Sequence, residues 1–311
     1  MVALYDAAAG ARGHANPVRR EDLRIRWLML DDPREAVVVV GEGVDPDLLA
    51  YASASVDLET DAGEATVHLE GQIHPRATGQ GLASWLLELA ERAGNRPTSS
   101  ERPTAPRVVR IRTALLDGDP GARAWFARRG FIPVRHLLEL RLDLHAPPPA
   151  PRWPPGISVR TFVPGADDEV LWRTHQAAFA DVPTHLPIAR DDYLADRAPA
   201  EDPGLVLLAE QHPREVVGIA VCRAGTELAA EDGWVRDLGI LPAWRRHGIA
   251  MALLRTAFAA FRTRGLTGVA LEVDDVTLEG AVALYRRAGM RVTRRTDVLE
   301  RVSLRDPAAS G

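Results

Sequence analysis

One pattern of sequence occurs twice in this chain of 311 residues. The segment 73–87 reads IHPRATGQGLASWLL and the segment 240–254 reads ILPAWRRHGIAMALL, with a proline and a glycine at matching positions. A second pair of segments matches as well, AWFARRGF at 124–131 and ALYRRAGM at 283–290. A duplication with so long a period predicts two copies of one fold joined in a single chain.

The C-terminal copy predicts a strand, a tight basic turn and a helix. The run from Trp234 to Leu241 is short, mostly apolar and followed by Pro242, which is typical of a strand that ends in a turn. From Ile249 onward, apolar residues recur at intervals of three and four, the spacing of a helix that packs on a sheet. Two arginines, a histidine and a glycine lie between the two elements.

This basic turn is a candidate anion-binding site. The first N–H groups of a helix have no partner inside it, and the helix dipole places about +0.5 of a charge there. Arg245, Arg246 and His247 add positive charge beside those groups. The small residues Gly248 and Ala250 let a ligand approach the main chain. These features predict a phosphate site, and the alternative is a solvated turn before an ordinary amphipathic helix.

Composition restricts the partners and the location. Hydrophobic residues make up 46% of the chain, enough for packed cores, and the length suggests about two domains. Charged residues make up 26% with a formal net charge of −5, which argues against nucleic acid as a general partner. No uninterrupted apolar run approaches the ~20 residues of a membrane span, and the N-terminus lacks a basic segment followed by an apolar core. We therefore expect no membrane partner and a cytoplasmic location.

Cysteine and histidine usage gives no sign of a disulfide or a metal. Cys222 is the one cysteine and lies in an apolar run, so we interpret it as a small core residue. The nine histidines show no metal-ligand spacing, and we predict no metal site.

A proline-rich segment separates the two copies. Residues 145–156 read HAPPPAPRWPPG, a composition that forbids a helix or an interior strand and favours an extended spacer. We predict an N-terminal domain over 1–145, a linker over 146–156 and a C-terminal domain over 157–311. Periodicity places strands at 36–41, 48–58, 65–73, 108–116, from 131, 157–161, 205–210, 216–222 and 234–241, and helices at 19–30, from 82, 122–129, up to 181, 191–196 and from 248.

Three blocks of the C-terminal copy resemble the GCN5-related N-acetyltransferase (GNAT) family. Residues 245–250, RRHGIA, resemble its Q/R-x-x-G-x-G/A signature, and LGILPAW before them resembles its fourth strand. LEVDD at 271–275 is similar to the fifth strand, and AVALYRRAGM at 281–290 to the A-x-x-LY-x-x-x-GF segment. The resemblance implies the α/β (α+β) class, with two tandem GNAT folds that each have a mixed, mostly antiparallel central sheet flanked by helices.

The same resemblance implies acetyl-coenzyme A (acetyl-CoA) as the cofactor. In that family the signature holds the pyrophosphate, the fourth and fifth strands splay to admit the pantetheine arm, and the tyrosine faces the thioester sulfur. Thr277 stands where relatives carry an asparagine that bonds the pantetheine arm, and a helix cap is the alternative role. The implied cofactor-binding residues are Leu238, Gly239, Ile240, Arg245, Arg246, His247, Gly248, Ile249, Ala250, Thr277 and Tyr285.

Acetyl transfer to an amine also needs proton chemistry. The thiolate must be stabilised or protonated as it leaves, and the amine must lose a proton. Tyr285 is the candidate acid, because a phenol with a pKa of about 10 can donate to a thiolate whose conjugate acid has a pKa of about 8.5. The helical spacing of Tyr285 suits a core residue equally well.

The base is less well defined. Several family members carry a glutamate on the fourth strand at the position of Trp234, and tryptophan cannot take a proton. Asp237 is the nearest candidate, although strand alternation puts it on the opposite face from Trp234 unless a bulge intervenes. Glu231, Asp232 and an amine that loses its proton to solvent are the alternatives.

The N-terminal copy lacks two of these side chains. Thr78 stands where Arg245 stands and brings no charge. Phe126 stands where Tyr285 stands and cannot donate a proton. We predict a degenerate domain that supports the other one. Its turn still offers a possible second cofactor site, made of Ile73, Thr78, Gly79, Gln80, Gly81, Leu82 and Ala83.

Taken together, the motifs predict an N-acetyltransferase that moves an acetyl group from acetyl-CoA to the primary amine of a small molecule. The predicted route is direct attack in a ternary complex in the C-terminal domain. The alternative from another class is a catalytically silent acyl-CoA-binding or regulatory module. A protein N-terminal acetyltransferase is the third possibility, and we expect a monomer or a homodimer.

Overall fold

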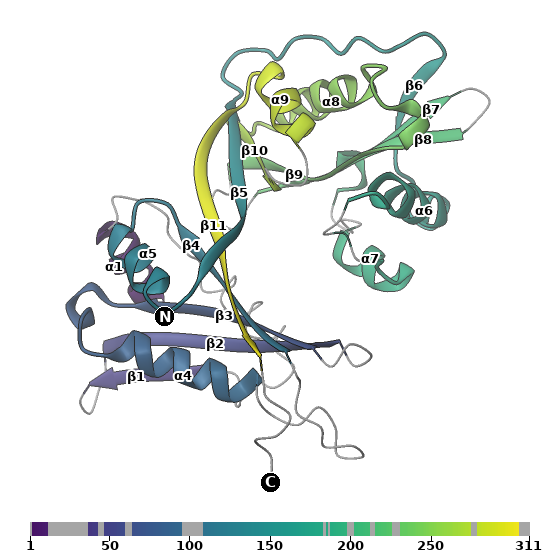
Figure 1. Cartoon of the computed structure of the whole chain (residues 1–311). Helices are drawn as coiled ribbons and strands as arrows, with labels where there is room; N and C mark the ends of the chain where they lie inside the picture. Colours follow the sequence, from purple (N-terminus) through teal and green to yellow (C-terminus); the bar gives the residue numbers. More distant parts are fainter. Residues whose placement is uncertain are drawn as a thin grey trace. The chain divides into compact units, whose positions relative to one another are not determined.

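The computed structural model describes residues 2–11, 37–42, 47–59, 64–94, 108–182, 185, 187–197, 202–211, 215–225, 231–274 and 279–304. The chain forms two compact units (Figure 1). Unit 1 comprises Met1–His136 and Thr296–Gly311, and unit 2 comprises Leu137–Arg295. The predicted helix at 19–30 lies outside the described residues.

Unit 1 is a mixed sheet with helices packed on it. Its described strands run in the order β1-β2-β3-β4-β11, antiparallel except for the parallel pair β3 and β4. Val67, Ile111 and Leu299 are among the buried residues of its core. Its elements are α1 (Val2–Ala11), β1 (Val37–Glu42), β2 (Asp47–Glu59), β3 (Glu64–Ile73), η1 (Pro75–Ala77), α4 (Leu82–Gly94), β4 (Val108–Leu116), α5 (Pro120–Ala127), the start of β5 (Ile132–Asp143) and the end of β11 (Arg291–Leu304).

Unit 2 repeats this plan. Its described strands run in the order β5-β10-β9-β8-β7-β6, antiparallel except for the parallel pair β9 and β10. Its elements are the rest of β5, β6 (Ile157–Thr161), α6 (Asp168–Phe179), α7 (Arg190–Arg197), η2 (Pro203–Leu205), β7 (Val206–Gln211), β8 (Glu215–Ala224), β9 (Asp232–Ile240), η3 (Pro242–Trp244), α8 (Ile249–Thr263), β10 (Gly268–Asp274), α9 (Glu279–Arg287) and the start of β11.

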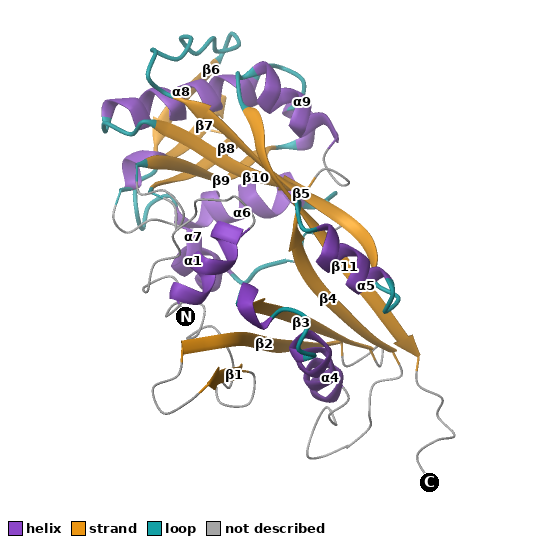
Figure 2. Ribbon diagram, turned by 90° about the vertical axis from the view of Figure 1, so that its left-hand side faces the viewer, coloured by secondary structure: helices purple, strands orange, loops and turns teal. Residues whose placement is uncertain are grey.

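Helices cover both faces of the unit 2 sheet. Figure 2 shows α8 and α9 on one face and α6 and α7 on the other. The alternating side chains of β8 and β9 divide accordingly, because successive residues of a strand point to opposite faces. Cys222 and Val235 belong to the core beneath α8, whereas Val221 belongs to the core that includes Leu171 of α6 and Tyr193 of α7.

The two compact units differ from the two predicted domains in where they divide. The chain passes between the units within β5 and within β11, at His136/Leu137 and Arg295/Thr296. The final strand of each sequence half pairs with a strand of the other half, since β5 pairs with β10 and β11 pairs with β4. The proline-rich segment 146–156 therefore connects β5 to β6 inside unit 2.

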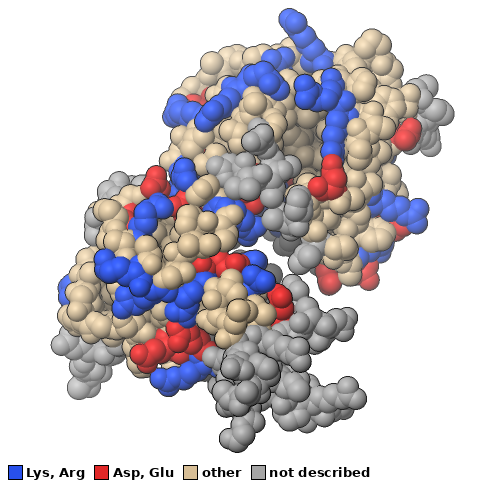
Figure 3. Space-filling model, viewed as in Figure 1, with Lys and Arg blue, Asp and Glu red and all other residues tan. Residues whose placement is uncertain are grey.

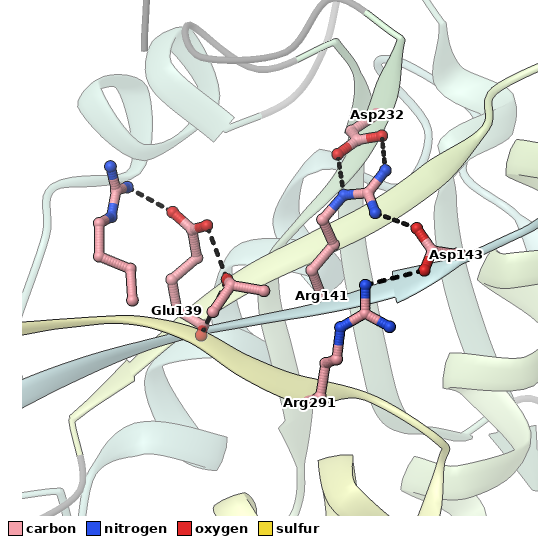
Figure 4. Close-up of polar contacts among 7 residues, drawn as sticks. Glu139, Arg141, Asp143, Asp232 and Arg291 are labelled. Carbon is pink, nitrogen blue, oxygen red and sulfur yellow. Dashed lines mark hydrogen bonds and ion pairs between the residues drawn. The ribbon is translucent and has the colours of Figure 1, made fainter. Parts of the chain in front are cut away.

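An ion-pair network joins three strands of unit 2 where β9 begins (Figure 4). Arg141 of β5 donates to both carboxylate oxygens of Asp232 on β9, Nε to Oδ2 at 2.6 Å and Nη2 to Oδ1 at 2.9 Å. A Cβ at Gly268 of β10 would collide with both side chains, so glycine is what lets them meet. Arg141 also pairs with Asp143, which accepts a 2.9 Å hydrogen bond from Arg291. The network clamps this end of the parallel pair β9 and β10.

Candidate active site

At the other end of the parallel pair, β9 and β10 separate. The register pairs residues 232–234 with residues 268–270, and no later pair between the two strands occurs among the described residues. The rest of β9 pairs with β8, and the rest of β10 pairs with β5. The splay that the family resemblance implies is therefore present between Trp234 and the end of β9.

The main chain of β9 has hydrogen-bonding groups on the side where the strands separate. The N–H of Leu241 donates to the carbonyl of Val217 on β8 at 3.0 Å. Because backbone groups alternate between the two edges of a strand, those of Ile240 and Leu238 face away from β8. These two predicted cofactor-binding residues thus present backbone groups toward the open side of the strand.

A bulge in β9 decides where Asp237 points. The register with β8 shifts between Val221, which pairs with Asp237, and Cys222, which pairs with Val235. Arg236 is therefore an extra residue, and alternation resumes beyond it with the opposite phase. Asp237 lies on the α6 face with its partner Val221. Because of this bulge, Asp237 and Trp234 point to the same face of the sheet.

Two glycines report the same change of phase. A Cβ at Gly233 would meet the ring of Phe261 on α8. A Cβ at Gly239 would meet Ala178 and Phe179 of α6, at 2.9 and 3.0 Å. Six residues apart, both would point to one face of a regular strand, yet they point to opposite faces.

Asp237 is buried beside a histidine that sequence reasoning did not single out. The Nε2 atom of His175 on α6 lies 3.9 Å from Oδ1 of Asp237. The residues are 3% and 9% exposed, respectively. The ring of His175 contacts Phe179, His185 and Tyr193, with centroid separations of 4.7, 5.2 and 4.5 Å. No motif marks His175, because its neighbour Asp237 lies far away in the chain.

Tyr285 lies on α9, in the core cluster beneath α8, and is 8% exposed. Its pKa is raised to about 12, first by burial of the phenol and then by the negative charge of Asp237. The phenol therefore remains protonated well beyond neutral pH and keeps its hydrogen-bond donor. The charge of one predicted proton-transfer group thus acts on the pKa of the other.

The predicted anion site has the expected backbone. α8 begins after Gly248, which has φ 86° and contributes no side-chain cap. Nothing lies within 4 Å of the position of a Cβ at Gly248. The N–H groups of the first turn of α8 are thus not capped by the N-cap side chain, whereas Ile249 is buried and anchors the helix. An uncapped helix N-terminus of this kind is chemically able to bind a phosphate group.

Arg246 adopts an unusual conformation in this turn. Its φ is 70°, which makes it the one non-glycine residue of the described chain in the left-handed region. That conformation costs about 1–2 kcal/mol for a residue with a Cβ. The side chain is exposed, so packing does not explain the choice of arginine. Such strain is often stored at functional sites.

Arg245 is held by α6 and the end of β9. Its Nη1 and Nη2 atoms donate to Asp181 at 2.5 and 2.8 Å, and Nη2 also donates to the carbonyl of Ala178 at 2.9 Å. Its Nε donates to the carbonyl of Ile240 at 3.3 Å. The hydrogen bonds from Arg245 hold the pKa of Asp181 below its usual range. The guanidinium that the signature assigns to phosphate thus links the turn to α6.

The neighbouring positions complete the turn. His247 Nδ1–H donates to the carbonyl of Arg245 at 2.8 Å, so Nε2 carries the lone pair of the neutral ring. On the face seen in Figure 3, arginine side chains gather over the part of unit 2 that carries α8 and α9. Arg286 and Arg287, both exposed, lie in the last turn of α9.

Several predicted residues lie elsewhere or outside the description. Thr277 lies outside the described residues. Asp232, an alternative base, is held by Arg141 at the clamped end of β9. Cys222 is fully buried in the core, and burial raises the pKa of its thiol. Within the described ranges, no cluster of three or more histidine, cysteine, aspartate or glutamate side chains is arranged so that it could hold a metal ion. None of the helices described there is long and apolar enough to cross a membrane.

Unit 1 contains a turn of the same design. η1 ends at Ala77, and Gly79 and Gly81 follow with φ 84° and 85°. The parallel pairing of β3 and β4 ends at Leu69 and Thr113, so these strands also separate. The residues of the possible second cofactor site, 73 and 78–83, surround this turn and the start of α4.

The phenylalanine that replaces the tyrosine is a packing residue in unit 1. Phe126 contacts the rings of Trp125 and Phe131, with centroids 4.9 and 5.1 Å away. Arg129 donates to Ser84 Oγ at the start of α4, at 2.9 Å, and lies over the Trp125 ring.

Comparisons with known proteins agree with this geometry. The family model "Acetyltransferase (GNAT) family" matches residues 169–290, which include the splayed strands, the turn and Tyr285. A mycothiol acetyltransferase of Streptomyces coelicolor is 33% identical over 97% of this chain and 90% of its own length. Another from Thermobispora bispora is 30% identical over 93% of this chain and 90% of its own length.

Solved structures agree at the level of the fold. A GCN5-related N-acetyltransferase from Sphaerobacter thermophilus superposes with a TM-score of 0.77, at 30% identity, covering 97% of this chain and 91% of its own. A tandem GNAT protein from the clavulanic acid biosynthesis pathway has a TM-score of 0.64 at 15% identity, covering 97% of this chain and 94% of its own. The second likeness supports the tandem fold alone.

Proposed function

Because the chain belongs to the GNAT family of acetyltransferases, we propose that unit 2 moves an acetyl group from acetyl-CoA to the primary amine of a small molecule. The observation that carries this proposal is the convergence in unit 2 of a splayed strand pair, an open glycine turn at a helix N-terminus, and the Tyr285 and Asp237 side chains. Acetyl-CoA is the acetyl donor throughout the family, and the chain is an acyltransferase.

The cofactor would lie along β9 and end at the turn. The pyrophosphate would accept hydrogen bonds from the main chain of Gly248, Ile249 and Ala250. Arg246 would add donors, and His247 would donate from Nε2 when its ring is protonated. The pantetheine amides would bond to the open-side backbone of Leu238 and Ile240 beside Gly239. Arg245 would contribute by fixing α6 against the turn, given its bonds to Asp181 and Ala178.

The proposed reaction is direct attack of the amine on the thioester. The amine nitrogen forms a bond to the carbonyl carbon, the carbon–sulfur bond breaks, and the amine proton passes to Asp237, directly or through one water. Tyr285 donates a hydrogen bond to the departing sulfur and can supply its proton. The raised pKa of Tyr285 keeps the phenol a donor at neutral pH.

The proposed acceptor is small. The similar curated relatives bear the name mycothiol acetyltransferase, so the deacetylated form of mycothiol is the first amine to test. Trp234 stands where several family members have a strand-four glutamate, which argues for testing other small primary amines in parallel. The acceptor would approach from the α6 face of β9, where Asp237 points.

Calorimetry and product analysis test the proposal. Titration of acetyl-CoA into the wild-type chain should give a site that Arg246→Ala weakens and that the matched variant Arg262→Ala, at the far end of α8, leaves intact. Incubation with each amine, followed by mass spectrometry, should show one acetylated product. Binding without transfer to any amine would favour a silent acyl-CoA-binding module. Absence of binding, or a site unaffected by Arg246→Ala, would contradict the proposed cofactor site.

A further inference from the structure

The α6 helix places an ionisable side chain directly behind Asp237. We propose that His175 is a positioning residue that acts through Asp237, so that the two side chains form one buried titrating pair on the acceptor side of β9. This inference rests on the proposed function, in which Asp237 receives the amine proton, and it adds His175 as the partner of that carboxylate.

The geometry of the pair gives it a chemical reason. His175 Nε2 lies 3.9 Å from Asp237 Oδ1, and the two residues are almost fully buried. A carboxylate in such a place is costly unless a positive partner is near, and an imidazolium is costly unless a negative partner is near. Each side chain therefore stabilises the charged form of the other, and the pair exchanges protons as a unit.

The position of His175 is fixed by contacts along α6. Three residues further on, Ala178 packs against Gly239 so closely that a Cβ there would lie 2.9 Å from the Ala178 Cβ. The carbonyl of Ala178 accepts a 2.9 Å hydrogen bond from Arg245, whose ion pair with Asp181 continues the attachment. α6 is thus fastened to the half of β9 that carries Asp237.

Several described groups lie near the pair or respond to its charge. Around His175 lie the side chain of Gln176, whose Nε2 is 3.5 Å from Nδ1, and the rings of Phe179, His185 and Tyr193. His185 and Tyr193 are the titratable members of that set. The negative charge of Asp237 contributes, after burial, to the raised pKa of the Tyr285 phenol and of the Cys222 thiol. The carboxylate of Asp237 is an acidic group that the structure places against His175.

The pair gives the amine proton a destination. As the nitrogen–carbon bond forms and the carbon–sulfur bond breaks, Asp237 receives the amine proton. His175 then releases a proton to solvent and takes up the one held by Asp237, which restores the charged pair for the next turnover. Tyr285 gives its proton to the sulfur and regains one from solvent after the thiol leaves. Turnover therefore depends on the protonation state of the pair, and its pH dependence belongs to both residues.

Nuclear magnetic resonance tests the coupling without any acceptor. The imidazole carbons of His175 are titrated in the wild-type chain and in Asp237→Asn, with His247, in the exposed turn, as the control in the same spectra. Loss of a negative neighbour at this distance should lower the pKa of His175 by about 1–3 units and leave His247 unchanged. An unchanged His175 titration would overturn the proposal.

Turnover supplies the second arm. With any amine that the wild type acetylates, His175→Gln should shift the pH profile of kcat while the Kd of acetyl-CoA stays unchanged. A superimposable profile in a folded variant would also overturn the proposal. Wild-type coupling without transfer to any amine would instead show that the proposed function fails while the pair stands. If His175→Gln does not fold, the titration in Asp237→Asn still decides.

Discussion

The two turns that precede α4 and α8 have the same backbone and different chemistry. Thr78 and Arg245 follow their 3-10 helices with φ −66° in both cases. Gly81 and Gly248 match at φ 85° and 86°. Between them, φ is 84° at Gly79 and 70° at Arg246, so an arginine in unit 2 accepts the conformation for which unit 1 uses glycine. Duplication preserved the geometry, and the difference lies in the side chains added to it.

The strands that lead into these turns also differ. β2 and β3 pair without a register shift from Ala50/Ile73 to Glu59/Glu64. β8 and β9 shift at Val221/Cys222. A bulge turns side chains that follow it to the other face, so unit 2 can place Asp237 toward α6. The two turns therefore differ in the backbone of the strands that lead into them as well as in their side chains.

The largest expected effect is on turnover, and it comes from giving α9 the phenylalanine that α5 carries at the matching position. Tyr285→Phe removes the donor, as Phe126 does in unit 1, and should lower kcat by about 10²–10⁴-fold, the range for a proton-transfer group. The Kd of acetyl-CoA should change far less, because the sulfur becomes a strong hydrogen-bond acceptor only as negative charge develops on it in the transition state. Steady-state kinetics and calorimetry measure the two quantities.

The reverse exchange is the control for that variant. Phe126→Tyr adds a phenol to unit 1 and should leave acetyl transfer unchanged, because the aligned environment lacks the bulged acid. Full turnover in Tyr285→Phe would remove this phenol from the mechanism.

The next effect concerns stability at high pH. The folded-state pKa of Tyr285 is about 12, against a reference value of 10.0, so the folded chain retains a proton that the unfolded chain loses between these pH values. The free energy of unfolding should therefore fall as pH rises from 10 to 12, by about 2–3 kcal/mol. Urea unfolding of the wild type and of Tyr285→Phe across this range measures the fall. The variant should lack this part of the pH dependence, and neither chain should show it below pH 9. Parallel pH curves would contradict it.

The smallest effect sharpens the comparison of the turns. Arg246→Gly gives unit 2 the glycine of unit 1 and relieves the left-handed conformation, while added chain flexibility offsets part of the gain. The net rise in the free energy of unfolding should be about 0.5–1 kcal/mol without ligand. Affinity for acetyl-CoA should fall about tenfold through loss of a charged hydrogen bond.

Gly79→Arg is the matched variant in unit 1, where arginine should destabilise by a similar amount. Urea unfolding measures both changes, and calorimetry measures the affinity. An Arg246→Gly variant that is less stable, or one that binds acetyl-CoA as well as the wild type, would indicate that this arginine has a structural role instead.

The sequence by itself determined the repeat, the strand–turn–helix order of each copy and the family. These properties depend on neighbours in the chain. Apolar spacing from Ile249 defines α8, and proline and glycine positions define the turn around Gly248. β4 and β6 have the predicted bounds for the same reason, because each is a run with β-branched residues between glycine or proline residues.

The tertiary structure alone decided which residues meet across long separations. The exchange of β5 and β11 between sheets depends on strand pairing, and β11, rich in arginine, carries too weak an apolar alternation to be predicted. The turn of Asp237 toward His175 depends on one extra residue in β9, and the attachment of Arg245 depends on Asp181 of a distant segment. Local sequence carries no information on such pairings, because burial, register and charge partners arise only when the sheets assemble.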